Sequence, residues 1–395
     1  MVSRCNFIIF GLVTSLILGC SGHSQAQLHT EFELDNGLRV KLLPLPTAKK
    51  NTLVVLYNVG NENDPAGKSG MAHLAEHLYV TAATRNTAAR NVQEYMSAYP
   101  DGWNAQTGDD YTVIATVFSA DRWNDEIADA ADRMRKIQVN PSDLDRELPR
   151  IDIELKNMYE GFPPLAVSNH GRHHSRLLAN GGRRGGKVVE LKTVTVDDMQ
   201  GWLDQYYKPG NAILILAGAF DTEDARKKIE KNFGSIGRGQ KPGDVTVPGP
   251  AEKRVHEVSL QPVSANAKSR VGYTFKAPRA DDPLYAAFLV HVMRMQMAAQ
   301  RTAKKKNMQD MPFMFRPLDD PDFFYASVDV KDGETSDEAL NGLDKMMSDH
   351  LGEDFQAFHV KQTRAMFGLF LGTQDMPAGM LAFNTYGAAF ALGRR

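Results

Sequence analysis

His73-Leu-Ala-Glu-His77 is the stretch around which the rest of this 395-residue chain is organised. Two histidines four residues apart lie on one face of a helix, and Glu76 lies beside the second of them. Ser69 is suited to cap the start of this helix. The apolar side chains around the motif recur at helical spacing and predict a buried stripe, formed by Met71, Leu74, Ala75, Leu78 and Ala82. The two histidines and Glu76 fall outside that stripe, so we expect them to face something other than the apolar core.

These residue types indicate a metal site. Imidazole nitrogens and a carboxylate suit Zn²⁺, and a catalytic zinc site uses three protein ligands and leaves the fourth position for water. The metal lowers the pKa of that water, and a carboxylate that is not itself a ligand can take the proton. Glu76 is placed for this role. A third ligand has to come from elsewhere, and the helix predicted over residues 142–161 carries Glu147 and Glu154 two turns apart on one face.

The His-x-x-Glu-His motif with its two downstream glutamates resembles the pitrilysin/insulinase family of zinc peptidases. The resemblance implies that His73, His77 and Glu154 bind Zn²⁺, that Glu76 is the catalytic base and that Glu147 supports the site. It implies a metalloendopeptidase that hydrolyses extended peptides. Two alternatives stay open: a non-catalytic subunit of a similar complex, and an envelope scaffold in which Glu147 completes a closed, structural zinc site with four ligands.

Strands and helices alternate on both sides of the motif. An Asp35-Asn-Gly37 turn predicts a hairpin, and the apolar run over residues 53–59 predicts a buried strand just before the metal helix. Further strands are expected over residues 111–118 and 212–219, and further helices over residues 91–99, 122–136, 195–206 and 222–233. This order predicts an α+β fold, with a mixed, mostly antiparallel sheet and helices packed on one face.

A glycine- and proline-rich segment, residues 237–252, predicts a linker between an N-terminal zinc-binding peptidase domain (residues 27–236) and a C-terminal domain (residues 253–395). The order of elements recurs beyond it, with strands over residues 269–276 and 323–330 and helices over residues 283–297, 336–351 and 355–369. The resemblance implies two similar α/β sandwich domains. We expect the second to be inactive, because it has no second His-x-x-Glu-His, and shortened, because no counterpart of residues 212–233 follows.

Residues 1–26 have the features of a targeting segment. Arg4 provides a positive start, residues 7–18 are apolar but short for a membrane span, and Ile17-Leu-Gly-Cys20 resembles a bacterial lipoprotein cleavage site. Cys20 would then be lipidated and anchor the protein in the cell envelope. The alternative is ordinary signal-peptidase cleavage after Ser24-Gln-Ala26. Both interpretations predict export to the periplasm.

The composition and the resemblance together define the expected partners. A formal net charge of -2 argues against a nucleic-acid partner. The family places a segment like Asn104-Ala105 on an edge strand beside the zinc, where a peptide substrate adds as a further strand. The alternative for these two residues is a plain turn before a strand. A chamber closed between two half-molecules is typical of the family, so the resemblance implies a homodimer or a paired subunit.

Two features depart from the family pattern. Pro149 lies between the two downstream glutamates, where it is expected to kink or restart the helix. Family members also carry an Arg and a Tyr that grip the substrate, and nothing in residues 300–315 matches them. Arg301 and Tyr325 are weak substitutes, and a solvated or structural role is the more ordinary interpretation of both.

Overall fold

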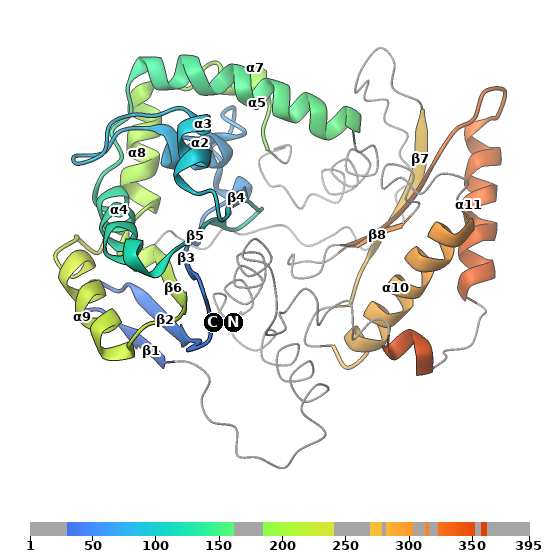
Figure 1. The fold of residues 1–395 in the computed structure, drawn as a ribbon. Coiled ribbons are helices and arrows are strands. Elements are labelled where there is room, and N and C mark those ends of the chain that lie inside the picture. Colours follow the sequence, from blue (N-terminus) through green and yellow to red (C-terminus); the bar gives the residue numbers. More distant parts are fainter. Residues whose placement is uncertain are drawn as a thin grey trace.

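The computed structural model describes residues 30–161, 185–240, 269–278, 282–302, 313–315, 323–351 and 357–361. These residues form two separate sheets, one from each half of the sequence (Figure 1). The leader, Cys20 and most of the predicted linker lie outside the described residues. Within the described part of the chain, no helix has the length and apolar character needed to cross a membrane.

The first sheet has six strands in the order β1-β2-β6-β3-β5-β4. Their bounds are β1 (Thr30–Glu33), β2 (Arg39–Pro44), β3 (Asn51–Tyr57), β4 (Trp103–Thr107), β5 (Thr112–Phe118) and β6 (Ala212–Gly218). Every neighbouring pair is antiparallel except β2 and β6, which are parallel. The sheet is therefore mixed and mostly antiparallel, as predicted, and β3, the strand that precedes the motif helix, lies inside it.

Helices cover one face of this sheet. They are α2 (Met71–Thr81), α3 (Val92–Ala98), α4 (Trp123–Arg135), α5 (Pro141–Gly161), α7 (Val188–Leu191), α8 (Val196–Tyr206) and α9 (Thr222–Phe233). Side chains alternate between the two faces of a strand. Leu53 and Val55 of β3 accordingly join a core cluster with residues of these helices, whereas Val54 and Leu56 join a separate cluster of strand and loop residues. The predicted arrangement of helices on one face is confirmed.

The start of α2 differs from the sequence prediction. Ser69 does not cap the helix; its backbone N–H donates to Glu190. The N-cap is Gly70, with a φ of 106° in the left-handed region that favours glycine. The free N–H groups of the first turn donate instead to Asp64, from Gly70 to Oδ2 at 2.6 Å and from Ala72 to Oδ1 at 2.8 Å. A carboxylate six residues upstream thus fixes the helix that carries the motif.

Pro149 does not restart the helix that carries the two downstream glutamates. A single helix, α5, runs from Pro141 to Gly161 with Pro149 inside it. Proline removes the N–H that would bond to Asp145, four residues back, and its ring crowds the carbonyl of that residue. The remaining backbone bonds and the packing of α5 against α2 maintain the helix, so Glu147 and Glu154 keep the two-turn spacing that the sequence predicts.

The second sheet has three antiparallel strands in the order β7-β9-β8. The strands are β7 (Arg270–Lys276), β8 (Phe313–Phe315) and β9 (Phe323–Asp329), and the helices beside them are α10 (Tyr285–Thr302) and α11 (Ser336–Leu351). Their shared core contains Val292, Phe313 and Leu343. The short strand β8 was missed by the sequence analysis. Tyr325 is buried in β9, in line with its structural interpretation.

The cap of α2 leads to a stability prediction. Asp64→Ala leaves two N–H groups at the start of a buried helix without an acceptor, so we expect it to lower the free energy of unfolding by about 2–4 kcal/mol. Asp221→Ala is the matched control, because Asp221 is exposed and accepts from only one N–H, at the start of α9. Its expected cost is about 1 kcal/mol. Urea unfolding followed by circular dichroism measures both, and equal losses would contradict the role of Asp64.

Candidate metal centre

Helices α2 and α5 pack against each other and bring the three predicted ligands together. The Nε2 atom of His73 lies 3.5 Å from Oε1 of Glu154, and the Nε2 atom of His77 lies 3.3 Å from Oε2 of the same carboxylate. One ligand atom from each of the three residues lies within 4.8 Å of the other two. Among the described residues this is the one group of three or more such side chains that could hold a metal ion. The structure therefore assembles the ligand set that the resemblance implied.

The other nitrogen of each ring is already occupied. Nδ1 of His73 lies 3.0 Å from the backbone oxygen of Gly185, which can only accept, so this nitrogen carries the proton. Nδ1 of His77 lies 3.1 Å from Oε2 of Glu147 and donates to that carboxylate. When neutral, each ring therefore presents the lone pair of Nε2 toward Glu154. Such contacts to the second nitrogen fix the tautomer and orientation of metal-binding histidines.

Glu147 is fully buried and has four donors around its carboxylate. Oε1 accepts from Thr81 Oγ1 at 2.8 Å and from Arg146 Nε at 2.9 Å, and Oε2 accepts from His77 and from Arg150. Burial by itself raises the pKa of Glu147, but hydrogen bonds from His77 and Thr81 and the charge of Arg150 lower it to about 2. Glu147 is therefore an anion that accepts a hydrogen bond from Nδ1 of His77. It contacts the nitrogen that faces away from Glu154, which argues against the closed site with four ligands.

The centre attracts positive charge. Burial lowers the pKa of His77, but hydrogen bonds to Glu147 and Glu154 outweigh it and raise that pKa to about 9. Hydrogen bonds from His73 and His77 hold the pKa of Glu154 well below its ordinary value. The two histidines and the carboxylate therefore share a proton, and a metal cation that displaces this proton would meet two Nε2 lone pairs and one carboxylate. Two nitrogens and one oxygen form the donor set of catalytic zinc sites, so these residues fit Zn²⁺.

Glu76 stands beside this group without joining it. It is buried on α2, and its Oε2 accepts from Thr107 Oγ1 at 2.5 Å. Among the described residues this is the one hydrogen bond to the Glu76 side chain, which leaves Oε1 available. Thr107 is the last residue of β4, the edge strand that also carries Asn104 and Ala105. The alternative of a plain turn for these two residues is wrong.

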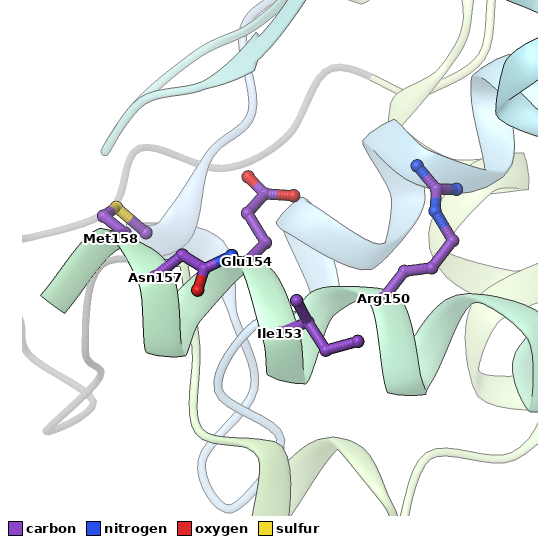
Figure 2. A pocket seen from close by; sticks show the side chains of 5 residues that line it. All are labelled: Arg150, Ile153, Glu154, Asn157 and Met158. Atoms are coloured by element: carbon purple, nitrogen blue, oxygen red, sulfur yellow. The ribbon is translucent and has the colours of Figure 1, made fainter. Parts of the chain in front are cut away.

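An open surface cavity of about 570 Å³ lies beside the centre along α5. Its lining residues are Arg150, Ile153, Glu154, Asn157 and Met158. Figure 2 shows that Arg150 and Glu154 project from the same side of the helix. The side chain of Glu154 is 52% exposed, whereas those of the two histidines are each 7% exposed. The centre is thus closed by the protein on the histidine side and open on the side of Glu154.

Five contacts of the site were missed by the sequence analysis: Thr81, Thr107, Arg146, Arg150 and Gly185. Thr81 lies one turn after His77 on α2, so helical spacing could have placed its hydroxyl near a partner of that histidine. Thr107 lies two residues after Ala105, and the alternation of a strand turns both to the same face. Arg150, three residues after Glu147, lies on the same face of the helix as that glutamate. Gly185 gave no signal, because its backbone oxygen meets His73 through a contact 112 residues away in sequence.

Two sequence models of one family match the chain. A model described as "Insulinase (Peptidase family M16)" matches residues 39–170, and one described as "Peptidase M16 inactive domain" matches residues 193–367. Together the two matches cover more than three quarters of the chain. The chain belongs to the M16 peptidase family. The first match contains the whole metal centre, and the second includes β6, which completes the first sheet, as well as the second sheet.

Individual members of the family show similarity to this chain over part of their length. Zinc protease PqqE of Helicobacter pylori is 26% identical over 242 residues, which are 58% of this chain and 52% of that protein. The mitochondrial-processing peptidase subunit beta of Saccharomyces cerevisiae is 24% identical over 257 residues, which are 62% and 54% of the two chains. The chain thus spans about half the length of these curated relatives.

Solved structures of the family share the fold. The periplasmic protease PqqL from Escherichia coli superposes with a TM-score of 0.66 at 16% identity, and the match covers 94% of this chain and 43% of that one. A protease from Helicobacter pylori gives a TM-score of 0.66 at 18% identity over 92% of both chains. These likenesses confirm the predicted fold class.

The centre yields a prediction about metal affinity. His73→Ala removes a ligand, so we expect it to lose stoichiometric binding of Zn²⁺. Glu147→Gln keeps the three ligands but replaces the carboxylate that accepts from Nδ1 of His77 with a weaker acceptor. We expect the affinity for Zn²⁺ to fall by about 10–100-fold. Asp143→Asn is the control, because Asp143 is buried on the same helix and contacts Arg146 rather than His77. Competition with a zinc-sensitive fluorescent chelator measures all three. Full affinity in His73→Ala would contradict the ligand assignment.

Proposed function

We propose that this protein is an exported zinc-dependent metalloendopeptidase that hydrolyses extended peptides. The observation that carries the proposal is the convergence of His73, His77 and Glu154, with Glu76 beside them but outside the ligand group. Membership of a peptidase family and relatives named zinc proteases support it. The complete motif also favours it over a non-catalytic subunit, because all five residues of the predicted centre are present and assembled.

The metal and the protein side chains contribute different steps of the proposed peptide hydrolysis. When bound at this centre, Zn²⁺ polarises the carbonyl of the scissile peptide and lowers the pKa of a water molecule. Glu76 accepts the proton of the attacking water at Oε1 while Thr107 holds Oε2. The water oxygen forms a bond to the carbonyl carbon, the carbon–nitrogen bond breaks, and Glu76 returns the proton to the leaving amine. Glu147 keeps the ring of His77 in position throughout.

Edge strand β4 supplies a place for the substrate. Among the described residues it pairs with β5 on one side only, so its other side forms the edge of the sheet. An extended peptide that adds there gains main-chain hydrogen bonds at Asn104 and Ala105. Thr107, at the end of the same strand, contacts Glu76. A substrate on this edge therefore lies beside the base, and extended chains are favoured over folded ones.

The proposed export rests on the sequence features of residues 1–26, which lie outside the described residues. The solved relative PqqL is a periplasmic protease, which supports the same location for this chain. Mass spectrometry of the protein from membranes of an expressing bacterium distinguishes the two cleavage sites. A lipidated Cys20 at the N-terminus supports anchoring, and an N-terminus at Gln27 supports ordinary cleavage. An uncleaved leader in the cytoplasm would contradict export. The expected pairing with a second half stays a prediction, which the molar mass in solution tests.

The decisive test of the function is Glu76→Gln. The variant keeps all three ligands, so we expect it to retain one Zn²⁺ per chain while its kcat falls by about 10²–10⁴-fold, since a general base contributes that much. Glu230→Gln, an exposed carboxylate on α9, is the control and should cleave at the normal rate. Zinc content by atomic absorption and cleavage of a quenched peptide library measure the two effects. Bound zinc without cleavage in any of the three proteins would favour the non-catalytic subunit instead.

A further inference from the structure

Arg150 places a cation in the wall of the cavity beside the metal centre. It precedes Glu154 by four residues, so the two side chains leave the same face of α5 one turn apart (Figure 2). Ile153, Asn157 and Met158 complete the lining. Arg150 is the one cationic side chain among these lining residues. The carboxylate of Glu154 turns toward the two histidines, so Arg150 is the one other charged side chain of the lining.

The guanidinium of Arg150 has N–H donors that bond to none of the described residues. Its Nη1 donates to Oε2 of Glu147, and this is its one hydrogen bond to the described residues. A guanidinium carries five N–H donors, and the side chain of Arg150 is 35% exposed. Glu147 therefore anchors one corner of the fork, while the side chain is partly exposed, lines the cavity and has further donors that bond to none of the described residues. Such a pre-positioned fork matches the geometry of a carboxylate.

Arg146 provides an internal comparison. It too donates to Glu147, through Nε at 2.9 Å, but its Nη2 is taken by Asp143 at 2.8 Å. It does not line the cavity. The two arginines thus share the role of holding Glu147, and Arg150 differs by presenting unused donors beside the metal ligands.

The spacing limits where a bound carboxylate would lie. Four residues of helix separate Arg150 from Glu154, a rise of about 6 Å along the axis. Two residues of an extended chain span about 6.6 Å. A group that meets Arg150 therefore belongs to a residue within two positions of the peptide bond at the centre. Ile153 and Met158 give the same cavity apolar surface for the aliphatic part of a side chain.

We propose that Arg150 makes this peptidase selective for substrates that carry a carboxylate within two residues of the scissile bond. The inference rests on the proposed function and adds a substrate class to it. The carboxylate has two possible sources, an acidic side chain or the free C-terminus of the peptide. A glutamate side chain suits the mixed polar and apolar lining, and the test separates it from the terminal carboxylate.

The test begins with binding, which does not depend on cleavage. Fluorescence anisotropy on zinc-loaded Glu76→Gln compares labelled peptides that carry Glu or Gln at each of the two positions on either side of the central bond, each as a C-terminal acid and as an amide. We expect a Glu peptide to bind about three- to fivefold more tightly than its Gln counterpart, since the contact is partly exposed. The same peptides with wild-type protein give the corresponding ratio of kcat/KM.

Two variants then assign the preference to Arg150. In the Glu76→Gln background, Arg150→Gln should bring the ratio of Glu to Gln affinity to about one, whereas Arg146→Gln should leave the ratio unchanged. Both substitutions weaken the hold on Glu147 and thus affect all peptides alike, so the ratio isolates the contact in the cavity. Arg150→Lys keeps the charge without the fork and should retain part of the preference.

The outcomes separate this inference from the function on which it rests. Discrimination in binding that disappears only in Arg150→Gln supports the inference, even if the wild-type protein cleaves nothing. A preference for acids over amides with no effect of the side chain assigns the carboxylate to the C-terminus and also supports it. Equal binding of all peptides, no binding up to millimolar concentration, or equal loss of preference in Arg146→Gln would overturn it, even if cleavage is efficient.

Discussion

The hydrogen bond between His77 and Glu147 is the contact on which the rest of the centre depends. It joins α2 to α5 in the interior, and both partners are buried. A buried carboxylate is costly unless donors and opposite charges surround it. Thr81, Arg146 and Arg150 meet that requirement, which keeps Glu147 ionised and able to orient the ring of His77. Glu154, two turns further along α5, is then brought to the opposite side of the same ring.

The centre was predictable from sequence because its geometry is mostly local. Helical spacing places His73 and His77 on one face of α2, and Glu147 and Glu154 on one face of α5. Only the packing of these two helices against each other is tertiary. The resemblance to a known family supplied that packing. Pro149 was the exception, since a local rule predicted a kink or a restart, and the restart does not occur: α5 runs through Pro149 and packs against α2.

The contacts that stabilise the centre were not predictable in the same way. Ser69 is the residue that local capping preferences favour, yet Asp64 takes the role because the loop before α2 folds back over its first turn. Burial raises the pKa of Asp64 to about 7, although the N–H groups of Gly70 and Ala72 act in the opposite direction. Strand β8 was missed because three residues carry too little pattern to distinguish a strand from a loop.

In the proposed function, edge strand β4 couples the substrate to the base. Trp103 and Ala105 both contact the apolar cluster formed with α2 and α3, so strand alternation turns Thr107 to the same side, where its hydroxyl reaches Glu76. Within the described part of the chain, the backbone of the same strand forms the edge of the sheet. Any shift of β4 when a peptide adds therefore moves Thr107 relative to Glu76, and a well-seated strand holds the carboxylate in one orientation. In the proposed reaction, main-chain pairing with the substrate and proton transfer by Glu76 would both depend on this one short strand, because it combines the edge of the sheet with the Thr107 contact to Glu76.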